Sequence, residues 1–251
     1  MSGRAGTGRS GRDARGDAGA GRDRDGRFEA AARDAAAHGG LAQLSGLPGW
    51  TRAYVVSHVA HNADALVNLL TWARTGVPTP MYASAEARAA QIEADAQRPD
   101  GELLGELTAA CTRFARAAAA ISGDQWLVPV QNFQGQTIRA ATVPSMRVRE
   151  VWVHAVDLGG AVTLADVPPP VTEFLLDDAV AGFAGRPDVP AVVLRATDTT
   201  RNWVLGATTS PAEVEVSGAT ASLAGYVMGR PVPGPLRAGG GGPVPQLPPW
   251  L

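Results

Sequence analysis

The sequence contains no lysine; all 22 of its basic residues are arginine. A Schiff base to a substrate and a P-loop for nucleotide phosphates both need a lysine, so the sequence excludes these two mechanisms. The 22 basic residues are balanced by 24 acidic ones, which gives a formal net charge of −2. Nucleic acids and anionic membranes attract strongly basic proteins, so we expect neither of them as a partner.

Cysteine is almost absent as well. Cys111 is the only cysteine, so no intrachain disulfide can form, which suits the reducing cytoplasm. It lies without a neighbouring histidine in a helical, alanine-rich stretch, ELTAACTRFARAAAAIS. We therefore interpret Cys111 as a small core residue. If the chemistry needs a thiol, either Cys111 or a small molecule must provide it.

Long apolar runs are also missing. No run approaches the roughly 20 residues of a membrane-spanning helix, and the charged N-terminus lacks the apolar segment of a secretory signal. Apolar residues make up 45% and charged residues 18% of the chain, as in globular proteins with a sizeable core. We expect a cytoplasmic, monomeric protein with one large or two ordinary domains.

The periodicity of apolar residues predicts a helical bundle over residues 27–166. The preceding residues 1–26 are mostly Gly, Arg, Asp and Ala with little to bury, and we expect a disordered tail there. Thr51 is a candidate N-cap, and Gly76 is placed to end the same helix. The expected helices span 28–38, 51–75, 84–97, 101–121 and 144–158, with a hairpin over 125–140.

The character of the chain changes after the VPPP stretch, so we expect a small α+β domain over residues 167–251. A helix over 171–184 precedes three runs typical of strands, and one more helix follows. The chain closes with an extended, proline-rich segment whose last two apolar residues can dock on the protein. The strand-like runs are PAVVLRAT, TRNWVLG and AEVEVSG. The fold class is therefore α+β in two domains.

A carboxylate and an imidazole stand four positions apart in the apolar stretch REVWVHAVDLG. In a helix, this spacing places Glu150 and His154 on one face, one turn apart. Both are ligands that zinc accepts, and a buried pair of this kind needs a partner such as a dication. A simple hydrogen-bonded or surface pair gives the same pattern, so the spacing alone is a weak signal.

A third ligand would have to be one of the remaining histidines. His38 stands beside a Gly-Gly pair at a helix end. His58 and His61 lie in the middle of an amphipathic helix, and His58 shares a face with Asn62. We therefore choose His58 as the third ligand of a metal site with two histidines and one glutamate.

Longer stretches of the sequence resemble the mycothiol-dependent maleylpyruvate isomerases from about residue 46 to the C-terminus. The stretches that carry this resemblance are LPGWTRAYVVSHVAHNADALVNLLTWARTGVPTPMYASAEAR, QGQTIRAATVPSMRVREVWVHAVDLG, SLAGYVMGR and PVPQLPPWL. The resemblance implies a DinB-like helical bundle followed by a small α+β domain similar to sterol-carrier folds. It further implies a zinc ion held by His58, Glu150 and His154, and mycothiol as the thiol cofactor. It also points to Arg88 as a substrate contact and to Arg230 as a catalytic residue.

Several neighbours of this set allow two interpretations. Asn62 is a candidate contact to thiol or substrate, or else a buried amide hydrogen-bonded to the backbone. Asp157 is placed either to orient a metal ligand or to cap a turn. His61 stands where relatives often carry Arg or Tyr, and it either supports a metal ligand or is a neutral filler, of which we favour the filler. The long first helix of the family is reduced here to an Ala/Arg/Asp-rich run, which leaves its completeness open.

The resemblance implies a cis–trans isomerase that converts maleylpyruvate to fumarylpyruvate in gentisate breakdown. A thiolate adds to the conjugated double bond, the chain rotates, and the thiolate leaves. Two alternatives stay open. One is another mycothiol-dependent zinc enzyme, such as an S-transferase, and the other is a zinc-binding sensor without catalytic activity.

Overall fold

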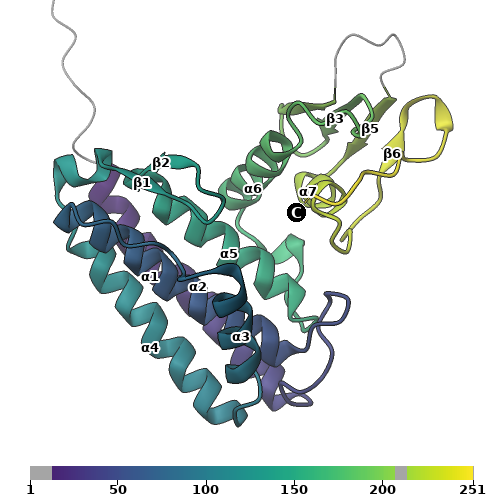
Figure 1. Ribbon diagram of the computed structural model, residues 1–251. Helices are drawn as coiled ribbons and strands as arrows, with labels where there is room; N and C mark the ends of the chain where they lie inside the picture. Colours follow the sequence, from purple (N-terminus) through teal and green to yellow (C-terminus); the bar gives the residue numbers. More distant parts are fainter. Residues whose placement is uncertain (1–12, 207–213, 251) are drawn as a thin grey trace, which may run out of the picture. The chain divides into compact units, whose positions relative to one another are not determined.

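The computed structural model describes residues 13–206 and 214–250, with side chains from Asp25 onward. The chain forms two compact units, Met1–Gly160 and Ala161–Leu251 (Figure 1). The boundary lies slightly before the expected one at 166/167, because Leu164 packs on Gly225 within the second unit. Within the described residues, every helix is too short or too polar to cross a membrane.

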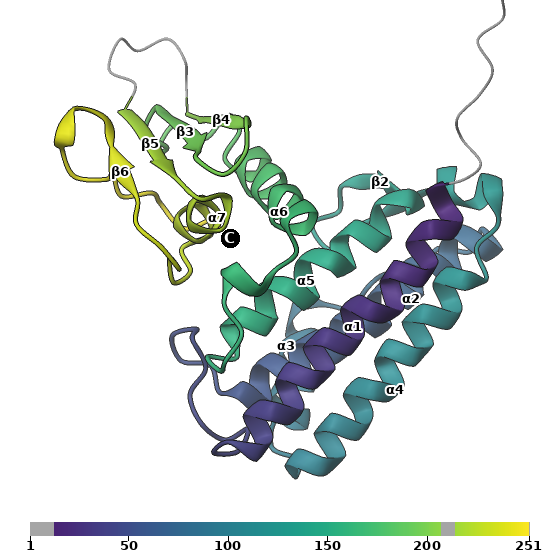
Figure 2. The same cartoon turned by 180° about the vertical axis from the view of Figure 1, so that it is seen from behind.

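Over the residues that the structure describes, the first unit is a bundle of four long helices with one short helix beside it (Figure 2). Helix α2 is a neighbour of α4 and α5, and α1 is a neighbour of the same two helices, so the four helices form a ring. The short α3 packs on α2. The helices are α1 (Asp13–Ala37), α2 (Arg52–Thr75), α3 (Ala85–Asp95), α4 (Asp100–Ala119) and α5 (Val143–Asp157). The expected helical bundle is confirmed.

The ends of α2 and α3 follow the signals in the sequence. The Thr51 hydroxyl accepts a hydrogen bond of 3.1 Å from the Tyr54 amide, which satisfies one of the unpaired N–H groups at the start of α2. Gly76 ends α2 in the left-handed conformation, with φ of 74°, which a residue without a Cβ adopts easily. Ser84 caps α3 by accepting from the Ala87 amide.

Helix α1 is longer than the sequence predicted. The expected disordered tail over 1–26 overlaps this helix, which begins at Asp13, and residues 1–12 lie outside the described residues. The buried Asp25 carboxylate accepts a hydrogen bond of 2.8 Å from Arg147 on α5. This buried ion pair holds α1 against the bundle at Asp25, just before the apolar part of the helix begins at Phe28.

A small hairpin joins α4 to α5. Strands β1 (Pro129–Gln131) and β2 (Thr137–Arg139) pair antiparallel. The turn contains Gly135 in the left-handed region, with φ of 76°. The hairpin confirms the prediction and presents Phe133 at its tip.

In its described residues, the second unit is a four-stranded sheet with two α-helices, which confirms the α+β expectation. The strand order is β4-β3-β5-β6; β3 and β5 are parallel, and the outer pairs are antiparallel. Helices α6 and α7 pack on each other and against the strands. The elements are α6 (Pro169–Gly182), β3 (Val192–Ala196), β4 (Asn202–Leu205), β5 (Val214–Gly218), α7 (Thr220–Met228) and β6 (Arg237–Ala238).

The C-terminal segment docks on α6, as the apolar end of the sequence suggested. Trp250 is buried, and a Cβ at Gly182 would lie only 2.9 Å from its indole nitrogen, so only glycine leaves room for the ring. The Arg186 guanidinium donates to the Pro249 carbonyl at 2.8 Å. These two contacts fix the proline-rich segment against the second unit.

Candidate metal centre

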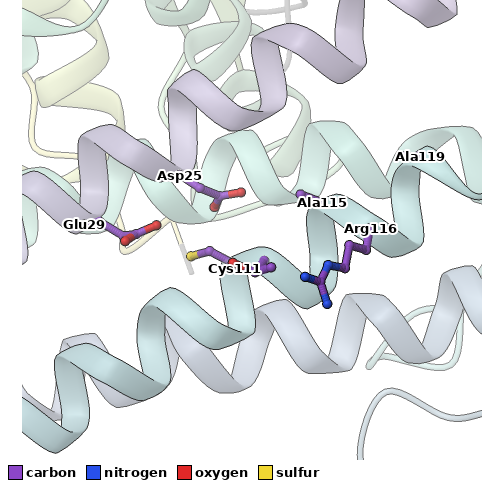
Figure 3. Close-up of a pocket in the computed structure, with 7 residues that line it drawn as sticks. Asp25, Glu29, Cys111, Ala115, Arg116 and Ala119 are labelled. Atoms are coloured by element: carbon purple, nitrogen blue, oxygen red, sulfur yellow. The ribbon is translucent and has the colours of Figure 1, made fainter.

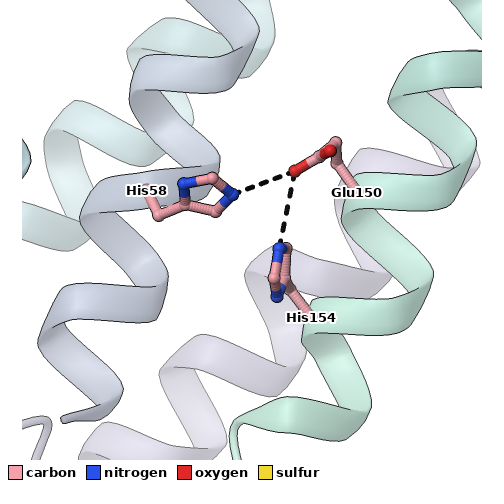
Figure 4. Close-up of side chains that lie close together, drawn as sticks. All are labelled: His58, Glu150 and His154. Atoms are coloured by element: carbon pink, nitrogen blue, oxygen red, sulfur yellow. Dashed lines mark hydrogen bonds and ion pairs between the residues drawn. The ribbon is translucent and has the colours of Figure 1, made fainter. Parts of the chain in front are cut away.

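His58 on α2 points at Glu150 and His154 on α5 (Figure 4). Nε2 of His58 lies 3.0 Å from Oε2 of Glu150, and Nε2 of His154 lies 3.5 Å from the same oxygen. One potential ligand atom from each of the three residues lies within 4.8 Å of the other two. In the described ranges of the chain, no other group of three His, Cys, Asp or Glu residues is gathered this closely.

The geometry of the cluster fits a divalent ion. Tetrahedral zinc with bonds of about 2.0–2.1 Å to nitrogen and oxygen places its ligand atoms about 3.3 Å from one another. The two separations from Oε2 of Glu150, 3.0 and 3.5 Å, lie on either side of that distance. Three protein ligands and one open position are typical of a catalytic zinc site. The same donors also accept other divalent ions.

His154 is held in position by Asp157. Its Nδ1 donates to Oδ2 of the buried Asp157 at 2.9 Å, which leaves Nε2 directed toward Glu150. Burial lowers the pKa of His154, but its contacts with Asp157 and Glu150 outweigh this and raise the pKa to about 9. A metal ion displaces the proton on Nε2, so its affinity should increase as the pH rises toward 9.

We expect Asp157→Asn to weaken metal binding by about 10–100-fold, because an amide orients the imidazole less firmly than a carboxylate does. Affinity is measured by competition with a chromogenic chelator. Asp95→Asn is the matched control, since Asp95 holds His61 at the same distance of 2.9 Å outside the cluster. Equal affinities in the two variants would show that Asp157 does not support the centre.

His58 has a cation beside it. Its Nδ1 lies 2.9 Å from Nη2 of Arg88. Because a guanidinium only donates hydrogen bonds, Nδ1 accepts, and Nε2 carries the proton that is donated to Glu150. A bound metal ion would take the place of that proton on Nε2. Arg88, predicted as a substrate contact, thus lies at the candidate centre.

Glu150 is the anionic member of the cluster. Burial raises its pKa, but hydrogen bonds from His154 and His58 outweigh this and hold the pKa well below its usual range. Burial lowers the pKa of His58, against the opposing effect of its bond to Glu150. The cluster therefore offers an ionised carboxylate between two imidazoles.

Trp50 forms one wall of the cluster, a role that the sequence analysis missed. Its ring lies edge-on to His58 with centroids 5.5 Å apart, and it stacks on His154 at 6.5 Å. The available signal was its place directly before the N-cap of the helix that carries His58. The indole shields both imidazoles from water on that side.

Arg147 fixes the register of the two helices that carry the ligands. Its buried guanidinium donates to the Val59 carbonyl at 2.8 Å and to Oδ1 of Asn62 at 3.2 Å, which joins α5 to α2. Val59 is the neighbour of His58, and Arg147 lies one turn before Glu150. Asn62 is thus a buried amide, but its partner is the Arg147 side chain and not the backbone that the second interpretation named. Its contact with thiol or substrate stays a prediction.

Arg52 joins the same two helices at the other end of the centre. Nε of Arg52 donates to the Leu158 carbonyl at 3.0 Å, and Nη2 donates to the Gly159 carbonyl at 3.4 Å. These carbonyls lie at the C-terminal end of α5, where the helix itself provides no partners. The antiparallel helices are thus held together on both sides of His58, which places it opposite Glu150 and His154.

The two other histidines are not members of this cluster. Nε2 of His61 lies 2.9 Å from the Asp95 carboxylate, and His38 is exposed beside Asp34. Arg230 belongs to the second unit, where its guanidinium donates to the Met228 carbonyl at 2.8 Å. It lines a cavity of about 580 Å³ that the C-terminal segment helps to close.

Comparisons with known proteins agree with this architecture. Residues 11–159 match the family described as the mycothiol maleylpyruvate isomerase N-terminal domain. A crystal structure of the mycothiol-dependent maleylpyruvate isomerase is 32% identical, with a TM-score of 0.85 over 94% of this chain and 97% of that chain. A variant of that enzyme with one histidine changed to alanine is 31% identical, with the same TM-score and coverage. No curated protein matches the sequence. This chain belongs to the mycothiol maleylpyruvate isomerase family.

Proposed function

We propose that this protein catalyses the mycothiol-dependent conversion of maleylpyruvate to fumarylpyruvate, a step of gentisate breakdown. His58, Glu150 and His154 would hold Zn²⁺ or a similar divalent ion. The observation that carries the proposal is the convergence of these three donors in a chain of this family. Because its only cysteine is unpaired and its cofactor would be a thiol, we place the activity in the reducing cytoplasm.

The proposed reaction replaces a slow rotation about a double bond by an addition and an elimination. A thiolate adds to one carbon of the cis double bond, and the displaced electron pair moves to the conjugated carbonyl as an enolate. The resulting single bond rotates, the enolate collapses, and the thiolate leaves with the trans double bond formed. The thiol is recovered unchanged. A bound divalent ion supplies a Lewis acid that lowers the pKa of a thiol.

The protein itself offers no reactive thiol. Burial raises the pKa of Cys111 to about 12. The thiol lines a cavity of about 310 Å³ between α1 and α4, where Asp25 and Glu29 add negative charge (Figure 3). A thiolate is disfavoured in these surroundings, so the nucleophile has to come from a small molecule.

We expect the native protein to resist alkylation of Cys111 by iodoacetamide at pH 8, because almost no thiolate exists there. The same protein unfolded in urea should react quickly, which serves as the control. Cys111→Ala should keep kcat within about twofold, since the change removes little more than one small buried group. Fast alkylation of the folded protein, or a large loss of kcat, would make Cys111 a candidate nucleophile.

Two arginines are assigned to the charge of the substrate. Maleylpyruvate is a dianion, and the addition step creates enolate charge. Arg88, beside His58, is proposed to bind a carboxylate, for which a guanidinium has a matching pair of N–H donors. Arg230 is proposed to stabilise the enolate. These assignments come from the resemblance and from the chemistry of guanidinium groups.

The test is to mix the zinc-loaded protein with mycothiol and maleylpyruvate. We expect the absorbance of the cis substrate to disappear while the total mycothiol stays constant. Consumption of one thiol per substrate would indicate an S-transferase instead. No conversion with zinc and mycothiol in excess would refute the proposed reaction and favour a sensor without catalytic activity.

A further inference from the structure

Phe133 is a large apolar side chain at the tip of the hairpin, with 43% of its surface exposed. Its ring packs edge-to-face on Tyr82, with centroids 5.4 Å apart and an interplanar angle of 85°. Tyr82 lies in the loop that leads into α3. An aromatic pair therefore connects two segments that are distant in the sequence.

The Arg88 guanidinium lies against both rings. Its Cζ is 5.3 Å from the centroid of Tyr82 and 5.6 Å from that of Phe133. The same guanidinium reaches His58 through Nη2 at 2.9 Å. The aromatic pair and the candidate metal ligand therefore hold one arginine between them, all within the first unit.

The Arg88 guanidinium lacks an acidic partner in the part of the chain that the structure describes. Among the described residues, no carboxylate forms an ion pair with it, whereas Arg147, Arg113 and Arg201 each have an acidic partner. An aromatic face attracts a guanidinium without neutralising it and without occupying its N–H donors. The guanidinium also forms side-chain hydrogen bonds with His58 and Tyr82, but it has five N–H donors, so these contacts leave it able to bind an anion.

We propose that Tyr82 and Phe133 form an aromatic cradle that positions Arg88 to bind a carboxylate of the anionic substrate. This inference rests on the proposed function. Phe133 is a positioning residue that acts through Arg88. A long arginine side chain loses much freedom when it binds a ligand, and holding it in place beforehand reduces that loss. The cradle also accounts for the exposed phenylalanine at the hairpin tip.

The first experiment compares steady-state kinetics of Phe133→Leu and Phe133→Tyr. Leucine keeps an apolar side chain but removes the ring, so the KM for maleylpyruvate should rise about three- to fivefold while kcat stays within twofold. A rise of this size corresponds to the loss of one exposed cation–π contact. Tyrosine should restore the wild-type KM. Val204→Ala is the control, because Val204 is 44% exposed in the second unit. An unchanged KM in Phe133→Leu would overturn the positioning role.

The second experiment needs no turnover and therefore separates the cradle from the proposed reaction. The Nε–Hε signal of Arg88 in ¹⁵N-labelled, zinc-loaded protein is assigned by its loss in Arg88→Gln, and maleate, a cis dicarboxylate, is titrated against it. We expect the signal to move on titration, and its apparent Kd to rise about three- to fivefold in Phe133→Leu. Without maleate, the loss of ring current in Phe133→Leu should already shift the signal.

The outcomes of the two experiments are distinct. If wild-type protein binds maleate as expected but does not convert maleylpyruvate, the cradle stands and the proposed reaction fails. If maleate leaves the Arg88 signal in place, the cradle proposal is wrong. If the KM rises in Phe133→Leu while the Arg88 signal is unchanged by that substitution, Phe133 contacts the substrate directly and the positioning role is wrong.

Discussion

Glu150→Gln should lower the affinity for zinc by more than about a hundredfold. The loss of a residue that only supports a metal ligand usually costs about 10–100-fold, and Glu150 is itself a proposed ligand. Glu150 is the only anionic donor of the cluster and lies next to both imidazoles. The amide keeps the size of the side chain but offers a neutral, weaker oxygen ligand. Turnover should disappear with the metal. Metal content after dialysis and competition with a chelator measure the effect.

Two kinds of variant complete this test. His58→Ala and His154→Ala should also lose the metal while the far-ultraviolet circular dichroism stays largely helical. Glu93→Gln is the control, because Glu93 is an exposed glutamate on α3 that accepts a hydrogen bond of 3.3 Å from Gln97, just after the end of the helix. Full metal occupancy in all three ligand variants would place the ion elsewhere.

Arg147→Met should destabilise the bundle by about 3–5 kcal/mol, because it leaves the charge of a buried partner uncompensated. The guanidinium contacts all three other long helices. It donates to Asp25 on α1 at 2.8 Å, to the Val59 carbonyl on α2 at 2.8 Å and to the Cys111 sulfur on α4 at 3.3 Å. Urea unfolding, followed by circular dichroism, gives the free energy of unfolding.

Two further variants make the stability result specific. In Arg147→Met combined with Asp25→Leu, part of the lost stability should return, since an apolar pair needs no charge compensation. Arg113→Met removes a half-exposed arginine that is paired with Asp64, and it should cost at most about 1 kcal/mol. Equal losses for Arg147→Met and Arg113→Met would show that the buried pair does not hold the bundle together.

The parts of the fold that depend on neighbouring residues were predictable from the sequence. The caps at Thr51 and Ser84 and the end of α2 at Gly76 each depend on a few adjacent residues. The pairing of Glu150 with His154 follows from the pitch of one helix. The sequence also allowed His58 to be chosen over His61, because His58 shares a helix face with Asn62.

The contacts that were missed join segments distant in the sequence. A run of Arg and Asp is typical of a solvated surface, so the pairing of Asp25 with Arg147, and with it the full length of α1, could not be inferred from composition. The cradle around Arg88 combines Tyr82 from a loop and Phe133 from a hairpin tip. Only the packing of the bundle shows that these residues meet.

The most direct test of the metal centre is an anomalous difference map from crystals grown with zinc. We expect one strong peak that lies about 2.0–2.2 Å from a nitrogen of His58, an oxygen of Glu150 and a nitrogen of His154. A peak bound by other residues, with His58 still hydrogen-bonded to Glu150, would contradict the assignment of these three side chains as the ligands.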